Sequence, residues 1–196
     1  MRRWAVWWGL ALVVVVAALL QGLSTMPGYS DTSTWAFWVA VSGSFVMLVA
    51  EILLVAWLAS ALAQDMPLAP PSAALVVWSC IVAVAAVAVV AYAPHAVPLI
   101  WTVAIIVLPA TALGRWDPLR GFVAFARHPG QAVAATMLLI VSGVAGMGVA
   151  FAAGFFLPGF LGGLAAWGWV GIVGAAFLLW WSRLLARPRR RSTVQG

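Results

Sequence analysis

Six long apolar runs constrain this chain more than any other feature. Each is near the roughly 20 helical residues that cross a hydrocarbon core about 30 Å thick. The runs lack the alternation of barrel strands, so helices must satisfy the backbone polar groups in lipid. The sequence therefore predicts an all-α, polytopic membrane bundle of about six transmembrane helices. The runs are Trp4 to Leu23, Trp35 to Ala63, Ser72 to Tyr92, Pro98 to Leu113, Ala132 to Ala153, and Gly162 to Leu185.

The composition agrees with lipid as the main solvent. Hydrophobic residues make up 66% of the 196 residues and charged residues only 7%, against about 25% charged in an average soluble domain. The first run is too long for a signal peptide and lacks a clear small-x-small cleavage site, which predicts that it is a retained helix. We expect residues 1–186 to form a single transmembrane domain and residues 187–196 a basic cytoplasmic tail.

The chain has ten arginines and no lysine, and the arginines fall in three groups that flank apolar runs. With six crossings all ten lie on one side, which the positive-inside rule assigns to the cytoplasm. The sequence thus predicts an integral protein of the plasma (cytoplasmic) membrane with both termini cytoplasmic. Anionic lipid headgroups are the expected partner, and nucleic acid is not. The arginines are Arg2 and Arg3, then Arg115, Arg120 and Arg127, then Arg183, Arg187, Arg189, Arg190 and Arg191.

Two features leave part of this topology open. The connection from Gln64 to Pro71 must also be cytoplasmic, although it has no arginine and contains Asp65. The fourth run is short and contains Pro109. If the third and fourth runs formed one re-entrant pair, four full crossings would leave both termini cytoplasmic.

Tryptophan provides an independent pattern, because its ring prefers the headgroup level. The predicted inner ends carry Trp4, Trp7, Trp8, Trp116, Trp180 and Trp181, and the predicted outer ends Trp35, Trp38, Trp101 and Trp167.

Glu51 is the single acid inside a predicted span, well away from both interfaces. An intramembrane ionisable residue is a functional hypothesis by default. No arginine lies within the spans to pair with it, so we expect a neutral carboxyl or a hydrogen bond to a nearby hydroxyl. Ser44, two turns away on the same helix face, is the candidate. Either a structural polar contact or a substrate or proton site fits.

No catalytic, metal or cofactor site is predicted. Imidazole could come only from His95 and His128, which the topology places on opposite sides of the membrane. The motifs of known intramembrane enzymes, such as paired aspartates or a serine with a histidine, are missing. No phosphate-binding glycine loop followed by lysine is present either.

The segment from Pro118 to His128 predicts a short helix, with Asp117 as its N-cap and Pro129-Gly130 as its stop. It suits an interfacial amphipathic helix between the fourth and fifth spans. A helix that docks a cytoplasmic partner is the alternative. The predicted apolar face is Leu119, Phe122, Val123 and Ala126, and the basic face is Arg120 and Arg127.

Small residues recur every four positions in the last two spans, which allows close helix packing. Packing within the chain and formation of a homo-oligomer are both open. The stripes are Gly146, Ala150 and Gly154, and then Gly159, Gly163, Gly171 and Ala175.

The second half, roughly Ile105 to Arg191, resembles the YesL-like family of small bacterial polytopic proteins. The resemblance implies an association with carbohydrate uptake systems. It is carried by Leu108-Pro109, Arg115, Trp116, Leu119, Arg120, the step Arg127-His128-Pro129, Leu157-Pro158 and the arginines after the last run.

These features favour a non-enzymatic membrane protein that is an accessory or assembly component of a transport system. The alternative is a small solute-binding subunit of a transporter, and an intramembrane enzyme is the third interpretation. A polar pocket between helices would favour the solute-binding subunit, whereas a dry, packed bundle would favour the accessory component. The sequence does not identify a substrate, a partner complex or an oligomeric state.

Overall fold

The computed structural model describes residues 2–24, 35–65, 68–157 and 159–186, and in these ranges the chain is all-α, as predicted. Six helices are long and apolar enough to cross a membrane, counting the 3-10 turn η2 together with α4. The chain is therefore a polytopic membrane protein. The elements are α1 (Arg2–Ser24), α2 (Trp35–Gln64), α3 (Ala73–Tyr92), η2 (Pro94–Ala96), α4 (Val97–Ala112), η3 (Pro118–Phe122), α5 (Val123–Arg127), α6 (Pro129–Phe156) and α7 (Phe160–Ala186).

Helix boundaries follow local chemistry. The Oγ of Ser72 caps α3 by accepting a hydrogen bond from the amide of Leu75 at 3.1 Å. The same hydroxyl donates to the carbonyl of Thr111 at 2.7 Å, which joins the start of α3 to the end of α4. Helix α6 begins at Pro129, earlier than the predicted start at Ala132. Proline is tolerated in the first turn of a helix, because the amide hydrogen that it lacks would have no partner within the helix.

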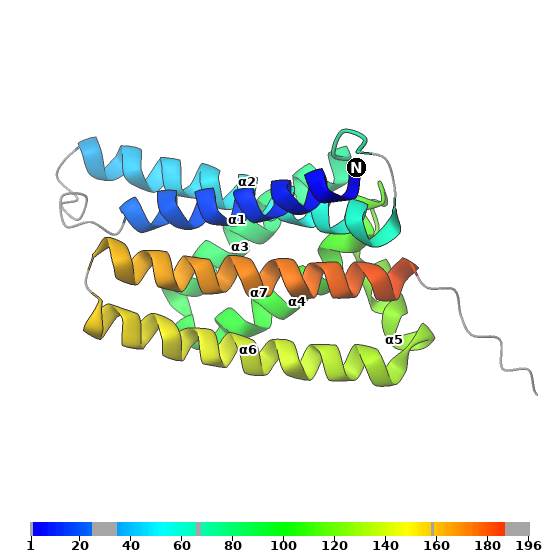
Figure 1. Cartoon of the computed structure of the whole chain (residues 1–196). Helices are drawn as coiled ribbons and strands as arrows, with labels where there is room; N and C mark the ends of the chain where they lie inside the picture. Colours follow the sequence, from blue (N-terminus) through cyan, green and yellow to red (C-terminus); the bar gives the residue numbers. More distant parts are fainter. Residues whose placement is uncertain (1, 25–34, 66–67, 158, 187–196) are drawn as a thin grey trace, which may run out of the picture.

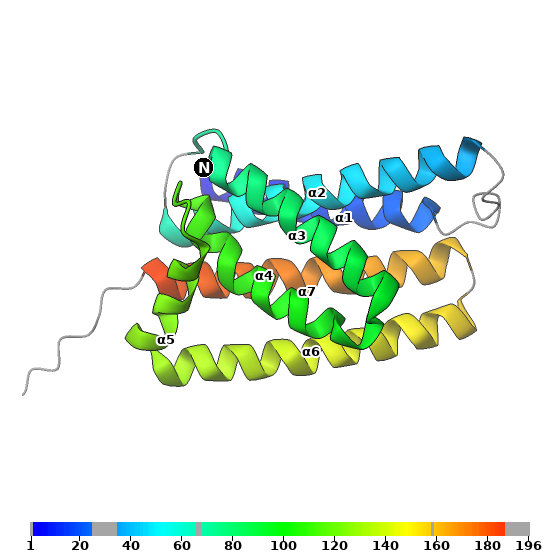
Figure 2. The same cartoon turned by 180° about the vertical axis from the view of Figure 1, so that it is seen from behind.

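Helix α7 is the central helix. It packs against α1, α2, α4 and α6. Figure 1 shows α1, α7 and α6 side by side in one layer. Figure 2, seen from the opposite side, shows the α3–α4 hairpin crossing obliquely in front of α7. Both views place the beginning of α1, the α5 region and the end of α7 at one end of the bundle.

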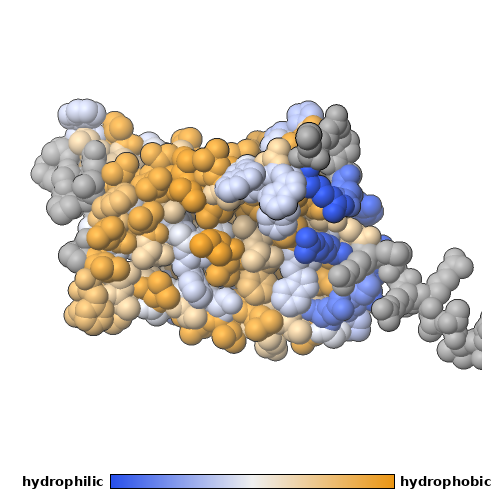
Figure 3. Space-filling model, viewed as in Figure 1, coloured by the Kyte–Doolittle hydropathy of each residue, from blue (hydrophilic) through white to orange (hydrophobic). Residues whose placement is uncertain are grey.

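We call this the basic end, because Arg3, Arg115, Arg120, Arg127 and Arg183 belong to it. Hydrophilic residues gather there in Figure 3, whereas the rest of that face is largely hydrophobic. The described arginines therefore share one end of the bundle, as the sequence predicted. The predicted tail of residues 187–196 lies outside the described residues.

The tryptophans of the predicted pattern differ in exposure. Trp4, Trp8 and Trp35 are largely exposed. Trp181 is different, because its side chain is only 1% exposed and its Nε1 donates to the carbonyl of Gly121 at 3.2 Å. The prediction that Trp181 belongs to an interfacial belt is wrong. Its indole N–H finds a partner inside the protein, where it links α7 to η3.

The α7 stripe of small residues packs within the chain. Gly163, Gly171 and Ala175 are all buried. On α6 the stripe is divided: a Cβ on Gly146 would lie 2.8 Å from Nε1 of Trp169, whereas Gly154 has open space around it. Close packing within the chain therefore accounts for the α7 stripe and for one position on α6.

Gly121→Ala should lower the free energy of unfolding in detergent by about 1–3 kcal/mol, the usual cost of overpacking. A Cβ there would lie 1.9 Å from the carbonyl oxygen of Ile106, and backbone must move to admit it. Thermal unfolding followed by circular dichroism measures the loss. Gly130→Ala is the matched control, since its Cβ would meet nothing within 4 Å. Equal stability of the two variants would show that η3 does not pack on α4 as described.

Candidate functional site: a buried carboxyl and an apolar groove

Glu51 lies deep in the bundle, where three helices meet. Its side chain is 7% exposed. A Cβ on Gly171 of α7 would lie 3.1 Å from Oε1 of Glu51 and 2.7 Å from Cγ1 of Val14 on α1. The carboxyl group thus packs tightly against the backbone of α7 at residue 171.

The Oε2 atom of Glu51 is buried and has no hydrogen-bond partner among the described residues. Ser44 does not supply one. Its hydroxyl donates to Oε1 of Gln21 on α1, and its carbonyl accepts from Nε2 of Gln21 at 3.0 Å. Ser44 therefore belongs to a contact between α1 and α2, and the predicted pairing of Ser44 with Glu51 is not formed.

Gln21 is a buried polar residue that the sequence analysis did not single out. It is 1% exposed and makes both of its described side-chain hydrogen bonds to Ser44. A lone amide inside the first apolar run was the available signal, because polar side chains in lipid commonly bond across helices. A second neutral contact joins α2 to α7, where the hydroxyls of Ser60 and Ser182 lie 3.2 Å apart.

A groove of about 750 Å³ runs between α1 and α7, and every residue that lines it is apolar. We call it the α1–α7 groove. Val14 lines this groove and also lies against Gly171, so the groove and Glu51 flank the same point on α7. The groove comprises Trp7, Leu10, Ala11, Val14, Val15, Ala18 and Leu19 of α1 and Leu164, Gly168, Ile172, Ala175, Ala176 and Leu179 of α7.

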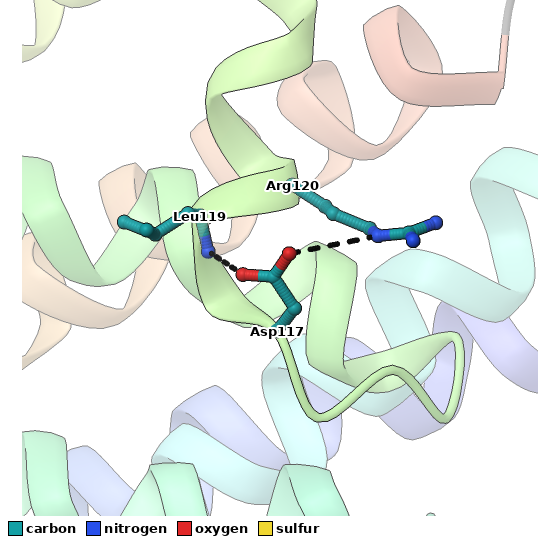
Figure 4. Close-up of polar contacts among 3 residues, drawn as sticks. All are labelled: Asp117, Leu119 and Arg120. Atoms are coloured by element: carbon teal, nitrogen blue, oxygen red, sulfur yellow. Dashed lines mark hydrogen bonds and ion pairs between the residues drawn. The ribbon is translucent and has the colours of Figure 1, made fainter.

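The connection between α4 and α6 starts as predicted. Oδ1 of Asp117 accepts from the amide of Leu119 at 3.0 Å, which is an N-cap contact. Oδ2 lies 3.6 Å from Nε of Arg120. Figure 4 shows that the side chains of Leu119 and Arg120 extend in opposite directions from this cap.

The predicted range is helical over Pro118–Phe122 and Val123–Arg127, but it is not a single α-helix. Its first part is 3-10 helix and only its second part is α-helix, so residues spaced for one α-helical face do not align. Gly121 and Ala124 are buried, whereas Leu119 and Phe122 are exposed. Val123 is partly buried, and the ring of Phe122 stacks on that of Phe125 at 6.1 Å.

The two arginines of this segment are exposed, but each has a contact within the chain. Arg120 pairs with Asp117, and Nη1 of Arg127 donates to the carbonyl of Leu185 at 3.4 Å. Exposed pairs of this kind contribute little to stability. Both side chains remain available to other anions.

Within the described ranges, no three His, Cys, Asp or Glu side chains gather into a group that could hold a metal ion. His95 lies in η2 and His128 follows α5, so α4 separates them by about 24 Å of helix. Comparisons of the chain with models of protein families, with curated proteins and with solved structures found no match. The resemblance to the YesL-like family stays a prediction from the residues of the second half.

Glu51→Met should raise the free energy of unfolding by about 1–3 kcal/mol, because it removes a buried oxygen that has no partner. Glu51→Gln keeps a neutral polar group of the same shape and should leave stability nearly unchanged. Thermal unfolding in detergent at neutral pH compares both variants with the native chain. If both variants unfold the protein while Glu51→Asp is harmless, the carboxylate is charged and has a partner.

Proposed function

We propose that this chain is a non-enzymatic integral membrane protein that serves as an accessory or assembly component of a transport system. The observation that carries the proposal is the chemistry of the space between the helices. Solute pockets need a few polar groups placed to fix the ligand. The α1–α7 groove is lined only by apolar residues, and the polar side chains of Gln21, Ser44, Ser60 and Ser182 bond to one another across helices.

The transport association rests on the resemblance of the second half to the YesL-like family. The partner that we propose is either a transport complex or a second copy of the chain. The intramembrane enzyme is not favoured by any arrangement of the described residues.

One observation favours a second candidate, the small solute-binding subunit of a transporter. Oε2 of Glu51 is a buried acceptor without a described partner, and such a group in a membrane span commonly marks an ion or substrate path. In this reading a cation or a hydrogen-bond donor of the solute would reach Glu51 from between α1 and α7.

We further propose that the basic end faces the cytoplasm and that the η3–α5 segment lies at that membrane surface. Arginine-rich ends are retained on the cytoplasmic side. The outward-facing Leu119 and Phe122 suit insertion among lipid chains. The opposing proposal is that these two side chains dock a cytoplasmic partner.

Cysteine accessibility tests the orientation in a Cys80→Ser background. His95→Cys, in the turn between α3 and α4 that the topology places on the outer side, should be labelled in intact cells by a membrane-impermeant maleimide. Leu68→Cys, in the arginine-free connection, should be labelled only after permeabilisation. Labelling of position 68 from outside would refute the six-crossing orientation. The same test applies to Ser30 and Gln195, which lie outside the described residues. We expect labelling from outside at Ser30, and labelling at Gln195 only after permeabilisation.

Spin labels test the position of the η3–α5 segment in liposomes. A label at Phe122 should be shielded from a water-soluble relaxation agent, because this side chain would insert among lipid chains. A label at Arg127 should be accessible. A label at Ala124, which is fully buried in the bundle, serves as the shielded control. Equal aqueous access at positions 122 and 127 would instead support docking of a cytoplasmic partner.

Extraction in lipid-retaining copolymer discs tests the function itself. From cells that make the chain at native levels, native mass spectrometry should detect it bound to permease subunits in a fixed ratio. The accessory role would be contradicted by two results together. The chain would be found alone in the discs, and its tryptophan fluorescence would change saturably as a solute is added. If Glu51→Gln then abolished that response, the second candidate would be correct.

A further inference from the structure

The α1–α7 groove runs along the helices rather than across them. On α1 it extends from Trp7 to Leu19, which is about 18 Å at 1.5 Å per residue. On α7 it extends from Leu164 to Leu179. Trp7 and Leu179 lie at the basic end, so the groove starts there and runs toward the opposite end. The length of its α1 wall is close to the roughly 15 Å that one leaflet contributes to a hydrocarbon core.

An arginine continues each wall of the groove at the basic end. Arg3 precedes Trp7 by four residues, and Arg183 follows Leu179 by four residues. Residues four apart share a helix face, so each arginine is in register with a groove wall. Both side chains are exposed. Arg3 pairs with Asp65 at the end of α2, whereas Arg183 has no hydrogen bond or ion pair to any other described residue.

We propose that the α1–α7 groove binds an acyl chain of an anionic phospholipid, whose phosphate is held by Arg183 and Arg3. The lipid belongs to the leaflet at the basic end. This is a specific site and differs from the general attraction of arginines to anionic membranes. Guanidinium groups bind phosphate oxygens in a bidentate manner, and basic pockets between transmembrane helices are known to hold anionic headgroups.

The size and the chemistry of the groove match a lipid chain. Its volume of about 750 Å³ falls within the roughly 300–1,000 Å³ of pockets that hold single small molecules. The lining is apolar from end to end, and Arg3 and Arg183 lie in register with its two walls at the basic end, where a headgroup would lie. Arg3 would exchange its exposed contact with Asp65 for the phosphate at little cost, because exposed ion pairs are weak.

A transmembrane helix of a partner fits the groove less well. Helices approach closely where small residues form the surface, but the rim here carries large exposed side chains such as Trp7, Leu19 and Ile172. A helix is about 10–12 Å across and would rest on this rim without filling the groove. A neutral helix would also leave Arg183 without a partner.

Native mass spectrometry of the purified full-length chain in detergent tests the proposal. The probes are phosphatidylglycerol, phosphatidylcholine with the same acyl chains, and inorganic phosphate. Phosphatidylglycerol should bind at least five-fold more tightly than phosphatidylcholine, and inorganic phosphate should not displace it. Arg183→Gln and Arg3→Gln should each weaken phosphatidylglycerol binding about five-fold, the contribution of one arginine near a lipid surface. Arg115→Gln, which removes an arginine away from the groove, is the charge-matched control.

Gly168→Trp tests the groove without changing charge. A Cβ at Gly168 would meet nothing within 4 Å, so the ring can enter the groove and should reduce phosphatidylglycerol binding more than ten-fold. Gly148→Trp on α6, which is equally open, should bind lipid as the native chain does. Equal binding by native chain, Arg183→Gln and Gly168→Trp would overturn the proposal. Loss of a dimer in Gly168→Trp, with unchanged lipid binding, would assign the groove to a second copy.

Discussion

The close approach of α1 and α2 to the backbone of α7 at Gly171 is the contact on which the rest of the bundle depends. A Cβ on residue 171 would clash with Val14 of α1 at 2.7 Å and would be in tight contact with Glu51 of α2 at 3.1 Å. In lipid, helices gain little from hiding apolar surface, so close packing must supply much of their association. A glycine at this point allows α1 and α2 to approach the backbone of α7 closely.

Neutral polar contacts fix the register of the helices around this point. Gln21 joins α1 to α2 through Ser44, and Ser60 approaches Ser182 across α2 and α7. Trp181 then ties α7 to η3. Such contacts contribute only about 0.6–2 kcal/mol each in membranes, but they stabilise one alignment of the helices relative to others. Glu51 departs from this pattern, because its Oε2 has no described partner.

The sequence predicted the helices well, because span length and breakers are local signals. It also predicted that the arginines would share one end, and that Asp117 would cap the following helix. It did not predict which residues face one another. Ser44 was matched to Glu51 by helix periodicity alone, whereas its partner Gln21 lies 23 residues away on another helix. Trp181 was misjudged for the same reason, since its burial depends on a contact with Gly121, which is distant in the sequence.

The stability of Gly171→Ala, alone and combined with Val14→Ala, tests the central role of this contact most directly. We predict that Gly171→Ala lowers the free energy of unfolding in detergent by about 1–3 kcal/mol, although Gly168→Ala, one turn away and facing open space, does not. Removing the Cγ1 atom of Val14 that blocks the new methyl group should recover part of the loss in the double variant. If Gly171→Ala is as stable as Gly168→Ala, and Val14→Ala gives no recovery, α7 is not held at the centre of the bundle by this contact.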